Sequence, residues 1–324
     1  MKYKEMLKMT SHIEEKIKEG SEISFSFDKL KFIEPAGAVL LLKTIEYLRQ
    51  ESVNYSIQNV NSLKDRLKAI SYGINMGIFQ EIGAMDSLRP KLSEGPSYVS
   101  PKQIERTKIF NDYNTSDEYA EDLATNIVQK AISFYKHKFD AGITDLLEFT
   151  LRELIRNIFD HANCKDFRYA LQKYEKNDFV EIVFADNGVG LRETVPFDSE
   201  EKFKGLDTDL QAIMKALLPG ISAYSNHGYA AEDYKNSGFG LSIVKRIIED
   251  SGGKLCIASG KKSILYENGQ SNIKDCKVQG TLVMLRIKPL ELSKVNFEEI
   301  ISQLQKEGSG DHSPSIASKS LKLT

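Results

Sequence analysis

The first ninety residues show a pattern of hydrophobic and polar positions that predicts a small α/β unit. Residues 23–27 (ISFSF) alternate as a strand, 36–50 have the apolar spacing of a helix, and 54–60 alternate as a second strand. A further helix is expected in the sequence NSLKDRLKAI, with Asn61 or Ser62 as its N-cap. The expected order is therefore strand, helix, strand, helix.

This regular pattern ends near residue 90. Pro90, Pro96 and Pro101 occur there among Ser, Gly and Asn residues, which is typical of a linker. We therefore predict four parts in the chain: an N-terminal α/β domain at residues 1–90, a linker at 91–117, a second domain at 118–290, and a C-terminal helix with a polar tail at 291–324.

The second domain is expected to contain both helices and strands. The turn sequence EKND between its first two strands favours an antiparallel hairpin. The hydrophobic pattern predicts helices at 117–139 and 144–162, and strands at 167–174, 179–186, 254–259 and 280–287.

A long connection at residues 191–237 separates the two halves of this domain, with one helical patch at 206–218. Insertions of this length are usually lids, binding loops or disordered segments. The sequence NSGFGLSIVKRIIEDSGG (236–253) follows and predicts a glycine-rich loop that leads into an amphipathic helix. The free amides of such a helix start can bind a phosphate, although an isolated GFGL more often precedes an ordinary core helix.

The composition favours a globular, soluble protein. The chain has 324 residues, 41% of them hydrophobic, which suffices for real cores, and its 44 Lys and Arg nearly balance 46 Asp and Glu. Neither nucleic acid nor a membrane surface is indicated as a partner. Cys164, Cys256 and Cys276 lack CxxC spacing, and there is no signal-like start or run of eighteen apolar residues. We expect a cytoplasmic protein.

The helix at 144–162 carries a candidate catalytic pair. Glu153 and Asn157 are four residues apart, so both side chains leave the same helix face and can reach one ligand. A carboxylate beside an amide could orient a water and supply an oxygen to Mg²⁺. The alternative is a solvated helix edge.

Two further motifs end or begin apolar strands. In DNGVG, Asp186 could accept a hydrogen bond from an exocyclic amine such as that of adenine, and Gly188 and Gly190 let the backbone approach a flat ligand. An Asx turn is the alternative for Asp186. In GTLV, the Thr281 hydroxyl either faces the same cleft or bonds its own backbone.

Taken together, ELIRN, DNGVG, NSGFGL and GTLV resemble the motifs of the GHKL superfamily, whose ATP-binding domain is shared by gyrase-type topoisomerases, heat-shock chaperones, histidine kinases and mismatch-repair proteins. The resemblance covers about residues 118–289 and includes the long lid between the second and third motifs. It implies the Bergerat fold, an α/β sandwich in which helices cover a mixed sheet, and the cofactors ATP and Mg²⁺.

The same resemblance implies a role for each matched residue. Asp186 would bind the adenine amino group, assisted by Thr281, with Gly188 and Gly190 along the base and ribose, and Asn157 would coordinate Mg²⁺. Backbone amides for the phosphates would come from Gly238, Phe239, Gly240 and Leu241.

The branch of the superfamily affects the expected chemistry. Asp160 resembles the acidic residue of the gyrase and chaperone branch, which makes Glu153 the general base for a water in an ATPase. His161 matches a residue type frequent in anti-sigma serine kinases, so a protein kinase is the alternative, and a nucleotide-gated scaffold that never turns over is a third.

The N-terminal unit resembles a STAS domain, the fold of anti-sigma factor antagonists, through LKFIEPAGAVLLLKTIEYL. Its turn places Ala36 where that family carries a phosphoaccepting hydroxyl, so this unit would dock or regulate and not accept phosphate. Any small α/β regulatory domain is the alternative. A protein partner is expected to bind through this unit, and dimerisation is left open.

Overall fold

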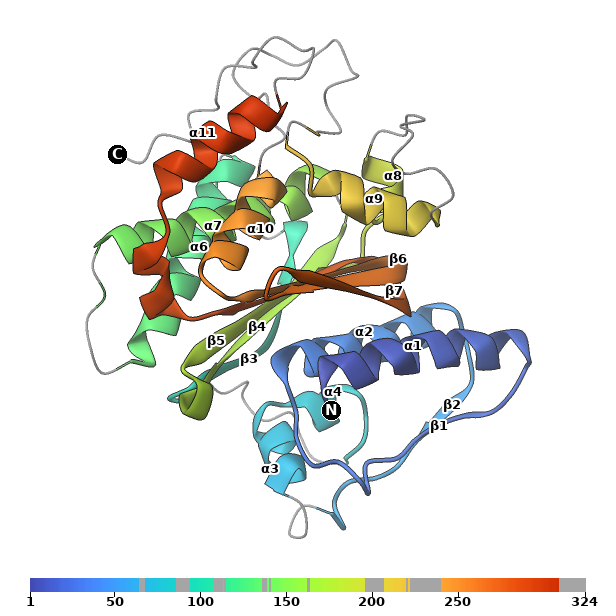
Figure 1. Cartoon of the computed structure of the whole chain (residues 1–324). Helices are drawn as coiled ribbons and strands as arrows, with labels where there is room; N and C mark the ends of the chain where they lie inside the picture. The colour runs from blue at the N-terminus through green and yellow to red at the C-terminus, as the bar shows by residue number, and fades with distance from the viewer. Residues whose placement is uncertain are drawn as a thin grey trace.

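A computed structural model describes residues 1–63, 68–85, 94–107, 113, 115–135, 139, 141–161, 164–195, 207–219, 221 and 240–308, the side chains of 160, 161, 305 and 308 excepted. A five-stranded sheet crosses the centre of the molecule (Figure 1). Its strands run in the order β3 (Tyr98–Glu105), β4 (Asp166–Tyr174), β5 (Phe179–Asp186), β7 (Gln270–Ile287) and β6 (Lys254–Glu267).

All neighbouring strands in this sheet are antiparallel, so the prediction of a mixed sheet was wrong. The reason is local, because two of the four neighbouring pairs are hairpins with short turns. One turn is η1 (Glu175–Asn177) followed by Asp178 at φ 47°, and the other has Asn268 at φ 52° and Gly269 at φ 71°. The hairpin predicted from EKND is confirmed.

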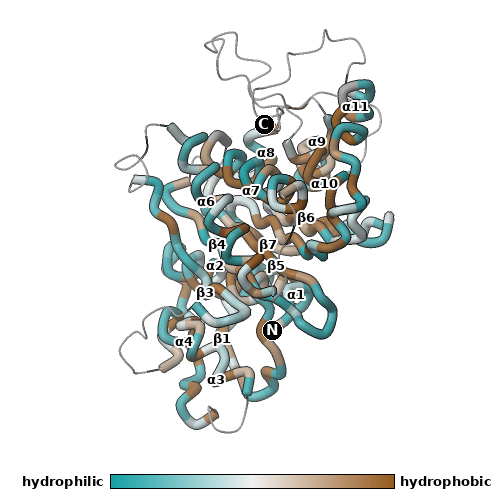
Figure 2. The backbone as a smooth tube through the Cα atoms, turned by 90° about the vertical axis from the view of Figure 1, so that its left-hand side faces the viewer, coloured by the Kyte–Doolittle hydropathy of each residue, from teal (hydrophilic) through white to brown (hydrophobic). Residues whose placement is uncertain are grey.

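Helices α6 (Ser116–Ser133), α7 (Ala141–His161) and α10 (Gly240–Asp250) lie on one face of the sheet. Alternate residues of β5, Val180, Ile182 and Phe184, point into this core because successive strand residues face opposite sides. Figure 2 shows hydrophobic stretches along the central strands between the helical layers.

Helices α1 (Tyr3–Lys18) and α2 (Pro35–Gln50) cover the opposite face (Figure 1). This face is lined by small or slender side chains, among them Ala170, Val183, Ala185 and Ala258. They let the two helices approach the strands closely, and one continuous apolar core results. The N-terminal segment therefore packs directly on the sheet that carries the candidate motifs.

The strand, helix, strand and helix predicted for the N-terminal segment occur in that order, but the unpredicted helix α1 precedes them and the last helix begins at Lys68, beyond the expected caps Asn61 and Ser62. Strands β1 (Ile23–Phe25) and β2 (Tyr55–Ile57) pair in parallel, as the crossover through α2 requires, and α3 (Lys68–Asn75) and α4 (Ile78–Glu81) follow. The specific likeness to a STAS domain stays a prediction.

Part of the expected linker at 91–117 is structured. Residues Tyr98–Glu105 form β3, whose Pro101 is compatible with an edge strand because proline cannot donate to a neighbouring strand. The division of the chain into the four predicted parts stays a prediction.

The remaining described elements flank the site or follow the sheet. Within the long connection, α8 (Leu191–Thr194) and α9 (Thr208–Ala216) are described, the latter matching the helical patch predicted at 206–218. After β7 come η4 (Pro289–Lys294) and α11 (Phe297–Gly308). The predicted lid otherwise lies largely outside the described residues, as does the tail from 309 onward. None of the described helices has the length and hydrophobicity needed to span a membrane.

Candidate functional site

A pocket opens between α7, α8, α10 and the end of the sheet. It has about 520 Å³ of empty space, including its mouth toward solvent. Its walls are mainly apolar, and its few polar side chains come from four different elements, α7, β5, α8 and β7. The lining residues are Leu154, Asn157, Ile158, Phe184, Asp186, Gly190, Leu191, Thr194, Leu241, Ile257, Thr281 and Val283.

Asp186 supplies the buried charge of this pocket. It is the last residue of β5 and points to the same side as Phe184, with only 2% of its surface exposed. The backbone N–H of Gly188 donates to its Oδ1 at 2.8 Å. Burial raises the pKa of Asp186, an effect that the nearby ammonium of Lys43 opposes.

The backbone around Asp186 leaves no room for extra side chains. Gly280 has φ +69°, and a Cβ there would overlap both the backbone oxygen and Oδ1 of Asp186. Gly190 has φ +80°, and its Cβ would lie 2.9 Å from Oγ of Ser259. That Oγ accepts from Leu191 N at 3.0 Å and donates to Gly280 O at 2.9 Å, which ties the turn after β5 to β6 and β7. Glycine is therefore required at positions 190 and 280.

The pair predicted on α7 lies at the other side of the pocket. Asn157 lines it, and its Nδ2 donates to the backbone oxygen of Glu153 at 2.8 Å, so its amide oxygen remains the atom suited to a cation. Arg156 Nη1 lies 3.5 Å from Glu153 Oε1, while its Nε lies 2.7 Å from Asp117 Oδ1 on α6.

Glu153 is also in close contact with the start of α10. A Cβ on Gly240 would be 2.6 Å from Glu153 Oε2, so only glycine leaves the carboxylate in its place. The Glu153 side chain is 13% exposed. The glycine of the NSGFGL motif thus clears space for a carboxylate of α7, in addition to any ligand.

The structure brings several of the sequence-predicted residues together. Five line the pocket: Asn157, Asp186, Gly190, Leu241 and Thr281. Gly188 is bonded to Asp186, and Glu153 and Gly240 are in contact beside the pocket. Gly238, Phe239 and the side chain of Asp160 lie outside the described residues.

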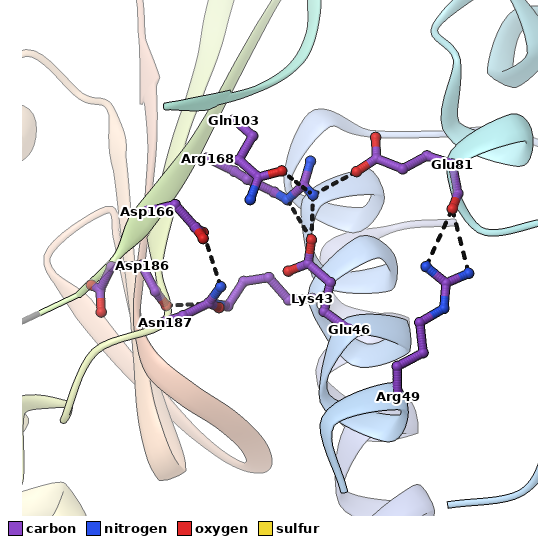
Figure 3. Close-up of polar contacts among 9 residues, drawn as sticks. All are labelled: Lys43, Glu46, Arg49, Glu81, Gln103, Asp166, Arg168, Asp186 and Asn187. Atoms are coloured by element: carbon purple, nitrogen blue, oxygen red, sulfur yellow. Dashed lines mark hydrogen bonds and ion pairs between the residues drawn. The ribbon is translucent and has the colours of Figure 1, made fainter. Parts of the chain in front are cut away.

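Two polar residues next to the site were missed from the sequence. Lys43 on α2 donates from Nζ to the backbone oxygen of Asp186 and to Oδ1 of Asn187 (Figure 3). The sequence does contain a sign of such a role for Lys43, because this lysine interrupts the apolar run AVLLLKTIEYL and is buried with it in α2. The contact of Lys43 with Asp186 could not be predicted from that run, because Lys43 and Asp186 are 143 positions apart in the sequence.

The pocket fits the adenine end of ATP. Apolar side chains suit a flat aromatic base, and a buried carboxylate suits its exocyclic amine. For a cation the described residues offer little, because no group of three His, Cys, Asp or Glu side chains among them could hold a metal ion. Mg²⁺ in such sites is held by one or two protein oxygens together with substrate phosphates, and the amide oxygen of Asn157 suits that arrangement.

A comparison with protein families agrees with this geometry. Residues 142–290 match the family described as histidine kinase-, DNA gyrase B-, and HSP90-like ATPase. The matched range begins in α7 and ends after β7, and it contains every residue that lines the pocket. The match supports a GHKL-type ATPase domain at residues 142–290, and that family implies ATP binding and an ATPase or kinase-like activity. No curated protein matches the chain.

Proposed function

We propose that the protein is a Mg²⁺-dependent ATPase in which nucleotide binding, with closure of a lid formed by residues 191–237 over the γ-phosphate, controls contact with a protein partner. The observation that carries the proposal is the pocket shared by Asn157, Asp186 and Thr281, with Glu153 at its edge. These residues come from distant parts of the chain and converge on one mainly apolar pocket. The N-terminal unit is the surface proposed to meet the partner.

Asp186 and Thr281 would bind the adenine. The Asp186 carboxylate would accept a hydrogen bond from the exocyclic amine, and the apolar walls, including Ile158 and Val283, would pack on the ring faces. Gly188 and Gly190 would lie along the base and ribose. A base without an amine at this position would leave the buried carboxylate unpaired, which gives the site its selectivity for adenine.

The phosphates would lie toward the start of α10. This helix begins at Gly240, so its first amides and the positive end of its dipole are available to an anion. Leu241, with Gly238 and Phe239 before it, would add backbone amides, and Asp160 would lie near the nucleotide. Asn157 would hold Mg²⁺, which would offset the negative charge of the phosphates.

Glu153 would act as the general base. Its carboxylate lies next to Gly240 at the start of α10, and it would accept a proton from the water that attacks the γ-phosphate and releases ADP and phosphate. The ion pair with Arg156 would hold the carboxylate in position before the substrate arrives. In a kinase the same base would instead accept the proton of a partner's hydroxyl.

Two measurements test the proposal. Calorimetry of the full chain with ATP, in the presence of Mg²⁺ and then of EDTA, should show Mg²⁺-dependent binding. Incubation with γ-labelled ATP, alone and in a host lysate, should release labelled phosphate. Label transferred to a protein would favour a serine kinase, and bound ATP that stays intact would favour a scaffold. Absence of ATP binding would contradict the proposed site.

A further inference from the structure

Lys43 connects the N-terminal helix α2 to the turn that carries Asp186. Its ammonium donates to the backbone oxygen of Asp186 and to Oδ1 of Asn187, as Figure 3 shows. Asn187 in turn donates from Nδ2 to Oδ1 of Asp166 on β4 at 3.1 Å. The first two residues of the DNGVG motif are therefore held by a chain of hydrogen bonds that starts in the N-terminal segment.

The contact crosses from one side of the sheet to the other. Val183 and Ala185 of β5 face α1 and α2, whereas Phe184 and Asp186 face the pocket. Lys43 reaches the strand end from the α2 side and bonds the backbone of Asp186 from behind, while the carboxylate remains on the pocket side. One residue of the N-terminal helix thus contacts the residue proposed to bind adenine.

Burying the charged ammonium of Lys43 carries a large desolvation cost. Its residue is 7% exposed, and burial lowers the pKa of its ammonium, while the carboxylates of Asp186, Glu46 and Asp166 act in the opposite direction. A buried ammonium is tolerated only when it is paired and hydrogen-bonded. The partners of the Lys43 ammonium are Asp186 and Asn187 of the DNGVG motif. The buried charge therefore stabilises the turn proposed to bind the nucleotide.

Other contacts already anchor α2 on the sheet. The backbone N–H of Ala36 donates to Oε1 of Glu181 on β5 at 3.0 Å, near the start of the helix. Further along the helix, Glu46 Oε1 accepts from Nε of Arg168 on β4 at 3.0 Å. Lys43 lies between these two anchors, so it is not needed merely to attach the helix.

We propose that Lys43 is a positioning residue of the nucleotide site, so that helix α2 of the N-terminal segment is a built-in part of adenine recognition. This inference rests on the proposed function, because it acts through Asp186. By fixing the backbone oxygen of Asp186 and the side chain of Asn187, Lys43 orients the carboxylate toward the pocket before a nucleotide binds. Binding at the pocket and the seating of α2 are therefore coupled.

The test compares Lys43→Met with Thr44→Val in the full chain. Both residues are buried to the same extent on the same helix, but Thr44 bonds only Leu40 O of its own helix, at 2.7 Å. Calorimetry should show about tenfold weaker ATP binding for Lys43→Met, the loss typical of removing a charged hydrogen-bond donor. Thr44→Val should bind as the wild type does. Thermal unfolding would verify that both variants are folded.

A double-mutant cycle separates positioning from a structural defect. If Lys43 acts through Asp186, Lys43→Met should weaken ATP binding no further once Asp186→Ala has removed the adenine contact. Equal losses in both backgrounds would overturn the inference. If Lys43→Met does not fold, Asn187→Ala removes the acceptor from the other end and should also weaken binding.

The possible failures are distinguishable. A wild-type protein that does not bind ATP would contradict the proposed function itself. A wild-type protein that binds ATP and needs Asp186, together with folded Lys43→Met and Asn187→Ala variants of unchanged affinity, would leave the proposed function standing and overturn only the role of Lys43.

Discussion

The backbone N–H of Ala36 donates to Oε1 of Glu181 at 3.0 Å, which places the start of α2 directly on strand β5. Both residues have 0% of their surface exposed. Glu181 also binds Arg286 of β7, whose Nη2 lies 2.9 Å from Glu34 Oε1 at the N-cap of α2. The residues that resemble a STAS phosphorylation site therefore form the buried start of α2, which packs against the sheet.

This burial predicts that residues 1–90 take up no stable phosphate when the protein consumes ATP. Ala36 has no nucleophile, and its position is closed to any kinase in the folded chain. Ala36→Ser would add a hydroxyl in the same closed position and should also stay unmodified. Mass spectrometry after incubation with Mg²⁺ and ATP checks both proteins. Stoichiometric phosphate on a Ser or Thr of this segment would favour the serine-kinase alternative.

Glu181 should make stability depend on pH. Burial raises the pKa of Glu181 to about 7, against the effect of Arg286 and reinforced by Glu34. The folded state then binds more protons than the unfolded state between about pH 4.5 and 7, so the free energy of unfolding should decrease as pH rises through this window. Glu181→Gln should remove that contribution. Urea unfolding at several pH values checks it, and identical pH slopes for both proteins would contradict it.

Asp186→Ala should weaken ATP binding by about 1–3 kcal/mol, roughly five- to hundredfold, because the adenine amine would lose its acceptor. The variant should stay folded, since burial already disfavours the charged form of this carboxyl. Asp275→Ala is a suitable control, because Asp275 lies on the β6–β7 hairpin with a side chain that is 73% exposed. Equal affinity of Asp186→Ala and wild type in calorimetry would exclude the assigned adenine site.

Periodicity predicted much of the fold. The strand expected at 179–186 has the same bounds as β5, and the helices expected at 117–139 and 144–162 correspond to α6 and α7. Helices α6 and α7 have one apolar face each, and β5 is a nearly continuous apolar run because both of its faces are buried, so the sequence patterns report burial. The signal for the β6–β7 hairpin was present but unused, because Asn268 and Gly269 are the pair that tight hairpin turns favour.

Long-range contacts were beyond the sequence. Strand β3 contains Pro101 and polar residues, so its assignment depends on pairing with β4, which no local pattern reports. The same holds for the site, since the motifs gave Asn157, Asp186 and Thr281, but the contact of Lys43 with Asp186 requires knowing that α2 packs behind β5. For a residue such as Lys43, whose contacts depend on the tertiary fold, the sequence shows only a charged residue within an apolar run.

Glu153→Gln should separate binding from chemistry. The amide keeps the shape of the side chain but cannot accept a proton, so ATP turnover should fall by about 10²–10⁴-fold with little change in affinity. Glu148→Gln, on another face of α7, is the matched control and should turn over at the wild-type rate. Single-turnover hydrolysis and calorimetry measure the two quantities. Wild-type hydrolysis by Glu153→Gln would show that another group is the base.

Gly240→Ala tests whether the contact between α10 and Glu153 matters for chemistry. The added methyl would lie 2.6 Å from Glu153 Oε2, so the carboxylate has to move, whereas alanine is well tolerated in a helix. We therefore expect turnover to fall at least about tenfold, because a general base loses efficiency when it leaves hydrogen-bond reach of its water. In the Glu153→Gln background the same change should cost nothing more, since the displaced group no longer acts as a base. Equal fractional losses in both backgrounds would mean that Gly240 serves the phosphates and not Glu153.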